Sequence, residues 1–162
     1  MAYFKSNYSS NAMTSLQINV HGLPKGQPRA KASRRGAFVR MYNPDTADDW
    51  KGCISRAVAA AVPKGTPFPL FAGPVRVDTT FVFPRPKGHF RKNGDIKPNA
   101  PTWHTNTPDR DNCDKAVLDV FTQCQVFADD AQVCDGRVMK RYAGVGEATG
   151  ARIHILSLND EG

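Results

Sequence analysis

The chain has 162 residues, of which 40% are hydrophobic, and carries a formal net charge of +7. This length predicts a single globular domain that buries enough apolar surface to fold without disulfide bonds. No apolar run approaches the ~20 residues of a membrane-spanning helix and no signal peptide opens the chain, which argues against membrane and secreted proteins.

The N-terminal residues bear on where the domain starts, and the cysteines bear on the redox state of its compartment. Residues 1–12 (MAYFKSNYSSNA) are polar and aperiodic and end just before a second methionine, Met13. We read them as a tag or cloning remnant, with a natural extension as the alternative, and place the domain at residues 13–162. No C-x-x-C pair occurs, which favours free thiols in a reducing cytoplasm over a zinc site. The four cysteines are Cys53, Cys113, Cys124 and Cys134.

The first part of the domain predicts a strand, a basic segment and a helix. Residues 15–22 (SLQINVHG) alternate apolar and polar side chains and end in glycine, which is typical of a strand. Residues 24–44 are basic and turn-rich, with a short hairpin expected around Arg35-Gly36. Residues 46–62 predict a helix, with Asp45 or Thr46 as its N-cap and Pro63 as its stop. Its apolar positions recur at helical spacing: Trp50, Cys53, Ile54, Val58 and Ala61.

The second part predicts further strands around one strongly amphipathic helix. Residues 75–83 (VRVDTTFVF) indicate a strand, and residues 84–106, with four prolines, indicate a long polar loop. A helix is predicted over Asp111 to Cys124, and strands over residues 132–144 and 151–158. The helix has this apolar stripe: Cys113, Ala116, Val117, Val120, Phe121 and Cys124. These elements predict an α+β fold, a mixed sheet of four to five strands with two main helices packed on it.

Positive charge is concentrated in two turn-rich segments. The first contains Lys25, Arg29, Lys31, Arg34, Arg35 and Arg40, and the second contains Arg85, Lys87, His89, Arg91, Lys92 and Lys97. Cations on loops suit contact with a phosphate backbone, although solvated loops are the plainer alternative. We therefore expect these segments to bind DNA.

Negative charge is concentrated in residues 107–121, TPDRDNCDKAVLDVF, and in the pair Asp129-Asp130. The first stretch contains four aspartates, Asp109, Asp111, Asp114 and Asp119. Each alone could be a helix cap, a partner of the helix dipole or a solvated side chain. A carboxylate cluster without histidine is also what Mg²⁺ or Mn²⁺ prefers.

Other acidic sites fit this pattern less well. A calcium-binding EF-hand loop counted from Asp109 would need glycine and glutamate where Asp114 and Val120 stand. A glycosidase carboxylate pair is less suited to a short chain with basic surroundings. A metal-carboxylate site beside basic segments suits phosphodiester hydrolysis, in which Lys115 could stabilise charge on the phosphoryl oxygens.

At this point the residues match a known family. The stretches PDRDNCDKAVLDVF and FADDAQV and a downstream lysine resemble the RusA family of Holliday-junction resolvases. The pattern P-D-x-D-N-x-x-K-x-x-x-D, then D-D-x-Q-V, then Lys, is filled throughout. The matching residues are Pro108, Asp109, Asp111, Asn112, Lys115, Asp119, Asp129, Asp130, Gln132, Val133 and Lys140.

The resemblance implies a homodimeric, Mg²⁺-dependent endonuclease, with Mn²⁺ as a substitute, that cuts four-way DNA junctions by paired nicks. It implies that Asp109, Asp111 and Asp130 are metal ligands and that Lys115 is the catalytic lysine. Asp129 would be a further metal ligand, a residue that positions the turn or an outer-shell contact, and Asp119 a structural or interface residue. His104 would support the backbone or contact DNA. Lys140 would join the DNA-contacting residues.

Two features depart from the family pattern. The 84–106 loop is longer than the pattern requires, and Thr107 stands where some relatives have a basic residue. These departures leave the junction contacts and any sequence preference open, but not the metal site. A non-catalytic protein that binds branched DNA and a nuclease for flaps are the alternative functions, because a motif does not define the shape of the DNA that a surface recognises. Leu118, on an otherwise polar helix face, indicates a dimer interface.

Overall fold

The structure, a computed structural model, describes residues 13–27, 31–35, 38–42 and 48–158. Side chains are described for residues 13–27 and 49–158. Within these ranges, no helix is long and apolar enough to cross a membrane. The four cysteines are free thiols, as predicted.

A mixed sheet of five strands forms one layer of the fold, which confirms the α+β prediction. Strands β1 (Ser15–His21), β7 (Gly150–Ser157) and β4 (Val75–Phe83) pair antiparallel in that order. Strands β5 (Val133–Asp135) and β6 (Val138–Tyr142) both run parallel to β4 along its other edge. β4 is therefore the central strand of the sheet.

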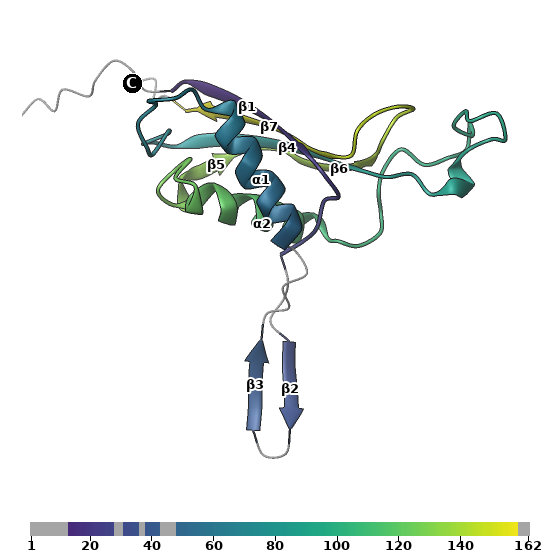
Figure 1. Cartoon of the computed structure of the whole chain (residues 1–162), viewed down its shortest axis with the longest axis horizontal. Helices are drawn as coiled ribbons and strands as arrows, with labels where there is room; N and C mark the ends of the chain where they lie inside the picture. The colour runs from purple at the N-terminus through teal and green to yellow at the C-terminus, as the bar shows by residue number, and fades with distance from the viewer. Residues whose placement is uncertain (1–12, 28–30, 36–37, 43–47, 159–162) are drawn as a thin grey trace, which may run out of the picture.

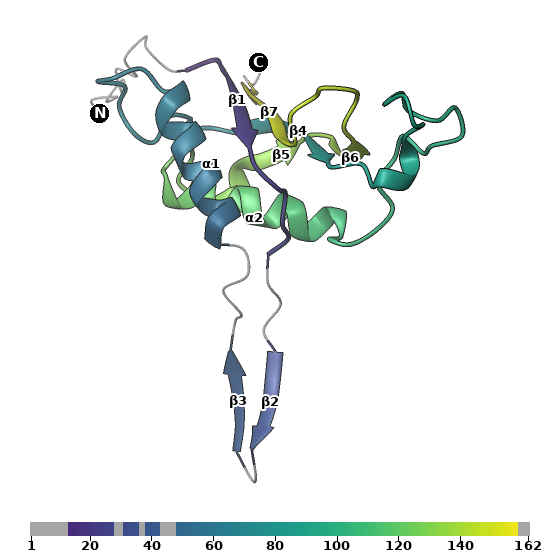
Figure 2. The same cartoon turned by 45° about the vertical axis from the view of Figure 1, so that its right-hand side comes forward.

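Two helices, α1 (Asp48–Ala61) and α2 (Arg110–Gln123), cover one face of the sheet (Figures 1 and 2). Strand residues alternate between this face and the outside, so every second residue of β1 is buried. The stripe predicted for α2 is buried from Cys113 to Phe121, and only Cys124 is partly exposed. Its bounds differ from the prediction by one residue at each end.

The predicted hairpin is present as a separate two-stranded sheet. Strand β2 (Lys31–Arg35) pairs antiparallel with β3 (Phe38–Tyr42) around residues 36–37. The predicted N-cap positions of the first helix, Asp45 and Thr46, lie outside the described residues.

The strand predicted over residues 132–144 is two strands, which is a correction. Gly136, between β5 and β6, has φ +149°, and a Cβ there would lie 2.0 Å from the carbonyl oxygen of Val77. The next residue, Arg137, donates its amide hydrogen to Asp78 Oδ1 at 2.8 Å, and its carbonyl accepts from Thr79. The pairing with β4 is therefore interrupted at Gly136 and resumes at Val138, which lies opposite Thr79.

The segment predicted as a long loop has defined internal structure. Residues 84–101, which we call the basic lobe, project from the end of the sheet (Figure 1). The lobe contains the short 3₁₀ helix η1 (Lys87–His89) and a bridge between Phe90 and Ile96. Arg85 fixes its base, because the guanidinium donates to the carbonyl oxygens of Ala143 at 2.7 Å and Pro101 at 2.8 Å.

The turn that joins β6 to β7 is held by a bidentate ion pair. Arg141 Nη1 and Nη2 donate to Glu147 Oε1 and Oε2 at 2.6 and 2.8 Å. The hydrogen bond from Arg141 is the main reason that the pKa of Glu147 falls from 4.5 to about 2. The same carboxylate accepts from the amide of Gly144 at 2.9 Å.

We expect this pair to make stability depend on pH. A lowered carboxylate pKa means that the stabilisation is complete above pH 4.5 and is lost as pH falls towards about 2. Glu147→Gln should lower the free energy of unfolding by about 1 kcal/mol at pH 7, with a smaller loss at pH 3. Urea denaturation at both pH values measures this. Asp95→Asn, in the exposed lobe, is the control, and a Glu147→Gln loss that stays constant with pH would contradict the prediction.

Candidate active site

Two of the predicted metal ligands lie at the start of α2. Asp109 is the N-cap residue, with an extended backbone, and its carbonyl oxygen accepts from the amide of Cys113 at 3.0 Å. Asp111 is in the first turn, and both side chains are exposed. The amino end of a helix carries partial positive charge, which favours two carboxylates so close together.

Cys113, between the aspartates in sequence, does not belong to their site. Its side chain is fully buried in the apolar stripe. Burial raises the pKa of its thiol to about 11, and the nearby carboxylates of Asp109, Asp111 and Asp114 add to the rise. The thiol is therefore neutral at physiological pH and serves as a core residue.

Asp114 is less exposed than a surface position of a helix would be. A solvated side chain was one of the roles considered for it, but its carboxyl is half-buried beside the β5–β6 edge. Burial raises its pKa, and the charge of Arg110 partly opposes this.

Lys115 lies on the exposed face of α2, in line with Asp111. The lysine ammonium lies 3.1 Å from Asp119 Oδ1. Asp119 is therefore the ion-pair partner of Lys115, and the predicted interface role of Asp119 stays a prediction. The side chain of Lys115 remains 59% exposed.

Leu118 is partly buried against the core, so the chain itself covers part of this side chain. The homodimer prediction that drew on it stays a prediction.

Asp129 and Asp130 are both exposed, and Asp129 also helps to build the turn after α2. Asp129 caps the 3₁₀ helix η2 (Asp130–Gln132), and its Oδ1 accepts from the amide of Ala131 at 2.7 Å. Gln132 completes the capping box through the amide of Asp129 and donates to the carbonyl oxygens of Phe71 and Gly73. The side chain of Asp129 therefore has a structural role while it remains exposed, and both aspartates line the same hollow.

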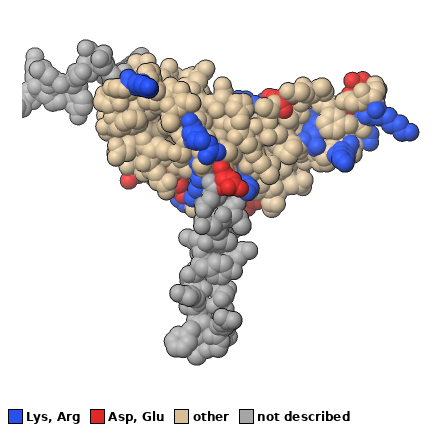
Figure 3. All heavy atoms as spheres, viewed as in Figure 1, with Lys and Arg blue, Asp and Glu red and all other residues tan. Residues whose placement is uncertain are grey.

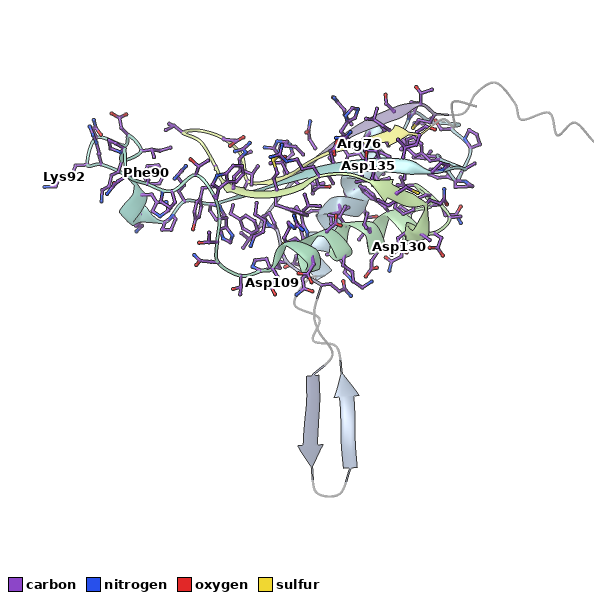
Figure 4. All side chains as sticks on the ribbon, turned by 180° about the vertical axis from the view of Figure 1, so that it is seen from behind. Arg76, Phe90, Lys92, Asp109, Asp130 and Asp135 are labelled. Atoms are coloured by element: carbon purple, nitrogen blue, oxygen red, sulfur yellow. The ribbon has the colours of Figure 1, made fainter. Side chains whose placement is uncertain are left out.

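The structure does not bring all the predicted metal ligands together within one chain. Asp130 lines a shallow hollow with Asp119, Thr122 and Gln123, at the end of α2. Asp109 and Asp111 lie at its other end (Figure 4), and 14 helical residues span about 20 Å. Among the side chains that the structure describes, no three His, Cys, Asp or Glu residues form a group able to hold a metal ion.

His104 and Lys140 lie close to the start of α2. The imidazole of His104 stacks on Phe83 with 3.8 Å between ring centroids, and its backbone amide donates to the carbonyl of Lys140. Burial, and next the charge of Lys140, lowers the pKa of His104. Lys140 Nζ donates to the carbonyl oxygen of Asn106 at 2.7 Å. Both predicted roles of the His104 side chain, backbone support and DNA contact, stay predictions.

The predicted DNA-contacting cations occupy several different places. Four are exposed on the basic lobe: Lys87, Arg91, Lys92 and Lys97. Figure 3 shows lysine and arginine side chains gathered on this projecting end. Arg85 instead holds the base of the lobe through backbone carbonyls, a role that no sequence signal indicated. Arg29 and the side chains of Lys31, Arg34 and Arg35 lie outside the described part of the chain.

Sequence reasoning missed the segment 23–27, which crosses the first turns of α2. The amide of Gln27 donates to the carbonyl oxygen of Asn112 at 2.9 Å. A Cβ on Gly26 would lie 3.0 Å from the Cβ atoms of Pro108 and Asn112, so only a very small residue fits closely here. The capping box at Asp129 could have been read from its D-x-x-Q spacing, whereas this contact joins segments far apart in sequence.

Comparison with known proteins assigns the chain to a family. The model of the family described as endodeoxyribonuclease RusA matches residues 21–155, which include every aspartate discussed above. The chain is also similar to "Uncharacterized protein YqaN" of Bacillus subtilis (strain 168), with 29% identity over 133 residues. That alignment covers 81% of this chain and 90% of the relative. The match over most of its length, together with the carboxylates at the start of α2, shows that this chain belongs to the RusA endodeoxyribonuclease family.

Proposed function

We propose that this protein is a Mg²⁺-dependent, structure-specific endodeoxyribonuclease that resolves four-way DNA junctions as a homodimer. The observation that carries the proposal is the exposed pair Asp109 and Asp111 at the start of α2, in a basic chain of this family. Mg²⁺ prefers carboxylate oxygens, and Mn²⁺ is the expected substitute.

The chain offers groups suited to phosphodiester hydrolysis. A bound divalent ion would polarise the scissile phosphate and lower the pKa of a bound water. Asp109 and Asp111 would hold that ion. Lys115, one helical turn beyond Asp111 on the same face, would place its ammonium beside the phosphoryl oxygens, where negative charge develops. Asp119 would orient this ammonium through their ion pair.

A second copy would complete the site. Asp111, Lys115 and the hollow that Asp130 lines lie along one face of α2. A two-fold axis through the middle of this face would place two α2 helices antiparallel. The start of each α2 would then lie beside the end of the other, so that Asp130 of the second copy joins Asp109 and Asp111. Such a dimer carries two identical sites, which suits paired nicks.

Two rival functions remain, and an observation on this structure bears on the first of them. A non-catalytic protein that binds branched DNA would be consistent with the separation of Asp130 from Asp109 in one chain. A nuclease for flaps would use the same site on another branched substrate. Side-by-side assays on a four-way junction, a flap and a linear duplex, with and without Mg²⁺, separate the three functions.

Asp111→Asn should reduce Mg²⁺-dependent nicking of a synthetic four-way junction by at least ~100-fold, because it removes one ligand charge. Junction binding, measured by gel shift without Mg²⁺, should be unchanged or tighter, since repulsion of phosphate falls. Asp95→Asn in the basic lobe is the matched control and should cut normally. Nicking by Asp111→Asn at the wild-type rate would reject the active-site assignment.

Mixing two inactive variants tests the shared site. If each site uses Asp111 of one copy and Asp130 of the other, Asp111→Asn mixed with Asp130→Asn forms heterodimers with one intact site. Random pairing should restore about a quarter of the wild-type sites. If each chain holds a complete site, the mixture stays inactive.

The double variant, with both substitutions in one chain, provides the reciprocal control. In a mixture with wild type, its heterodimers should be inactive if the site is shared. They should keep one active site if each chain works alone.

The basic lobe should contribute to DNA affinity. Replacing Lys87, Arg91 and Lys92 by alanine should weaken junction binding and reduce the slope of log K against log salt by about 0.9 for each lost phosphate contact. A matched variant removes three cations of α1 and the turn after it, Lys51, Arg56 and Lys64. Equal weakening by both variants would show that total charge, rather than the lobe, sets the affinity.

A further inference from the structure

A hollow of about 570 Å³ lies beside the start of α2, between the segment 23–27 and the carboxyl end of β4. Its lining includes Leu23, Lys25, Phe83, Pro84, His104 and Pro108. Pro108 directly precedes Asp109, so the hollow adjoins the carboxylate pair. Its volume lies within the ~300–1,000 Å³ of sites that bind small molecules.

The wall formed by residues 23–27 is fixed at both ends. At one end, Gly22 and Thr149 exchange hydrogen bonds, of 2.9 Å from the threonine hydroxyl and 3.2 Å from the glycine amide. At the other end, Gln27 is bonded to the carbonyl of Asn112, and Gly26 rests on Pro108. Figure 2 shows this segment after β1 passing across α2. The hollow is therefore part of the folded structure.

The lining combines apolar surfaces with one cation. Leu23 is 52% exposed, and Pro24 behind it is buried, so the wall presents apolar carbon to the opening. The opposite side is the stacked pair of Phe83 and His104, next to Pro84. Lys25, half-buried, provides an ammonium group that can donate to an acceptor.

These features favour a flat heteroaromatic group over a phosphate. A phosphate needs several convergent charged donors. Five of the nine lining residues are leucine, proline or phenylalanine, and Lys25 is the one lysine or arginine among the nine, with His104 and Thr107 as the other polar side chains. A nucleobase has two apolar faces and an edge with oxygen and nitrogen acceptors, to which a lysine can donate. The closeness of the hollow to Asp109 means that such a base would belong to a nucleotide near the phosphate being cut.

We propose that this hollow binds an unstacked nucleobase of the DNA strand that is cut, next to the scissile phosphate. The proposal rests on the proposed nuclease function. Removing a base from the stack costs least where pairing is already weakened, as at a branch point. The hollow would therefore favour branched DNA over linear duplex and would fix the phosphate in register with Asp109 and Asp111.

The test uses 2-aminopurine, whose fluorescence rises when it leaves the base stack. It is placed in turn at each nucleotide flanking the cut in a four-way junction and in a linear duplex of the same sequence. The full chain carrying Asp111→Asn is added to saturation, so that DNA is bound and not cut. We expect a rise of several-fold at one position in the junction and a smaller rise in the duplex.

Substitutions in the lining show whether the hollow causes the signal. Leu23→Ala removes apolar wall without changing charge, and Lys25→Met removes the ammonium but keeps the length of the side chain. Each should reduce the fluorescence rise at saturating protein and, in the otherwise wild-type chain, slow nicking by about tenfold. The matched controls are Phe68→Ala, an apolar residue exposed to 51%, and Lys64→Met, which should leave both unchanged.

The outcomes separate this proposal from the proposed function. If the junction is cut but fluorescence rises at no position, the proposal that the hollow binds a base is overturned and the proposed nuclease function stands. A rise that persists in the Leu23→Ala, Lys25→Met double variant also overturns it. A rise that depends on the hollow, without Mg²⁺-dependent cutting by the wild type, rejects the nuclease and keeps the hollow as a DNA-binding site.

Discussion

The burial of the apolar stripe of α2 under the sheet is the constraint on which the rest of this protein depends. Five residues from Cys113 to Phe121 are at most 2% exposed, and each large side chain contributes roughly 1.5–3 kcal/mol when buried. This contact fixes both the position of α2 and its rotation about its own axis. The opposite face, with Asp111 and Lys115, must then point away from the core.

The family motif is therefore a mixture of structural and exposed residues. Asp129 and Gln132 build the turn after α2. The carbonyl oxygen of Asn112 accepts a hydrogen bond from Gln27, in the segment that forms one wall of the hollow. Asp111, Lys115 and Asp130 are also exposed, and they lie on or beside one face of α2. A site for a divalent ion would then need that face to meet its counterpart on a second copy.

The surroundings of this face combine rigid supports with positive charge. Arg85 ties the basic lobe to the turn after β6, and the cations of the lobe are left exposed around it. The positive charge of Lys140, near the start of α2, contributes to the lowered pKa of His104 and partly opposes the rise in the pKa of Cys113. Exposed cations attract a phosphate backbone, whereas carboxylates repel it unless a metal ion lies between them. The cations proposed to bind DNA and the carboxylates proposed to hold a metal ion thus occupy different parts of the molecule.

The sequence by itself determined the types of the main elements, the buried stripe of α2 and the motif of the family, because periodicity and spacing are local properties. It did not predict the break at Gly136, since that break depends on the close approach of Val77. Nor could it reveal that Asp114 is half-buried or that Arg85 donates hydrogen bonds to backbone carbonyl oxygens of the same chain. Only the tertiary structure decided that Asp130 lies at the far end of α2 from Asp109. The course of the chain after α2 is fixed by hydrogen bonds from Gln132 to the carbonyl oxygens of Phe71 and Gly73. These bonds join segments far apart in the sequence, so no local pattern predicts them.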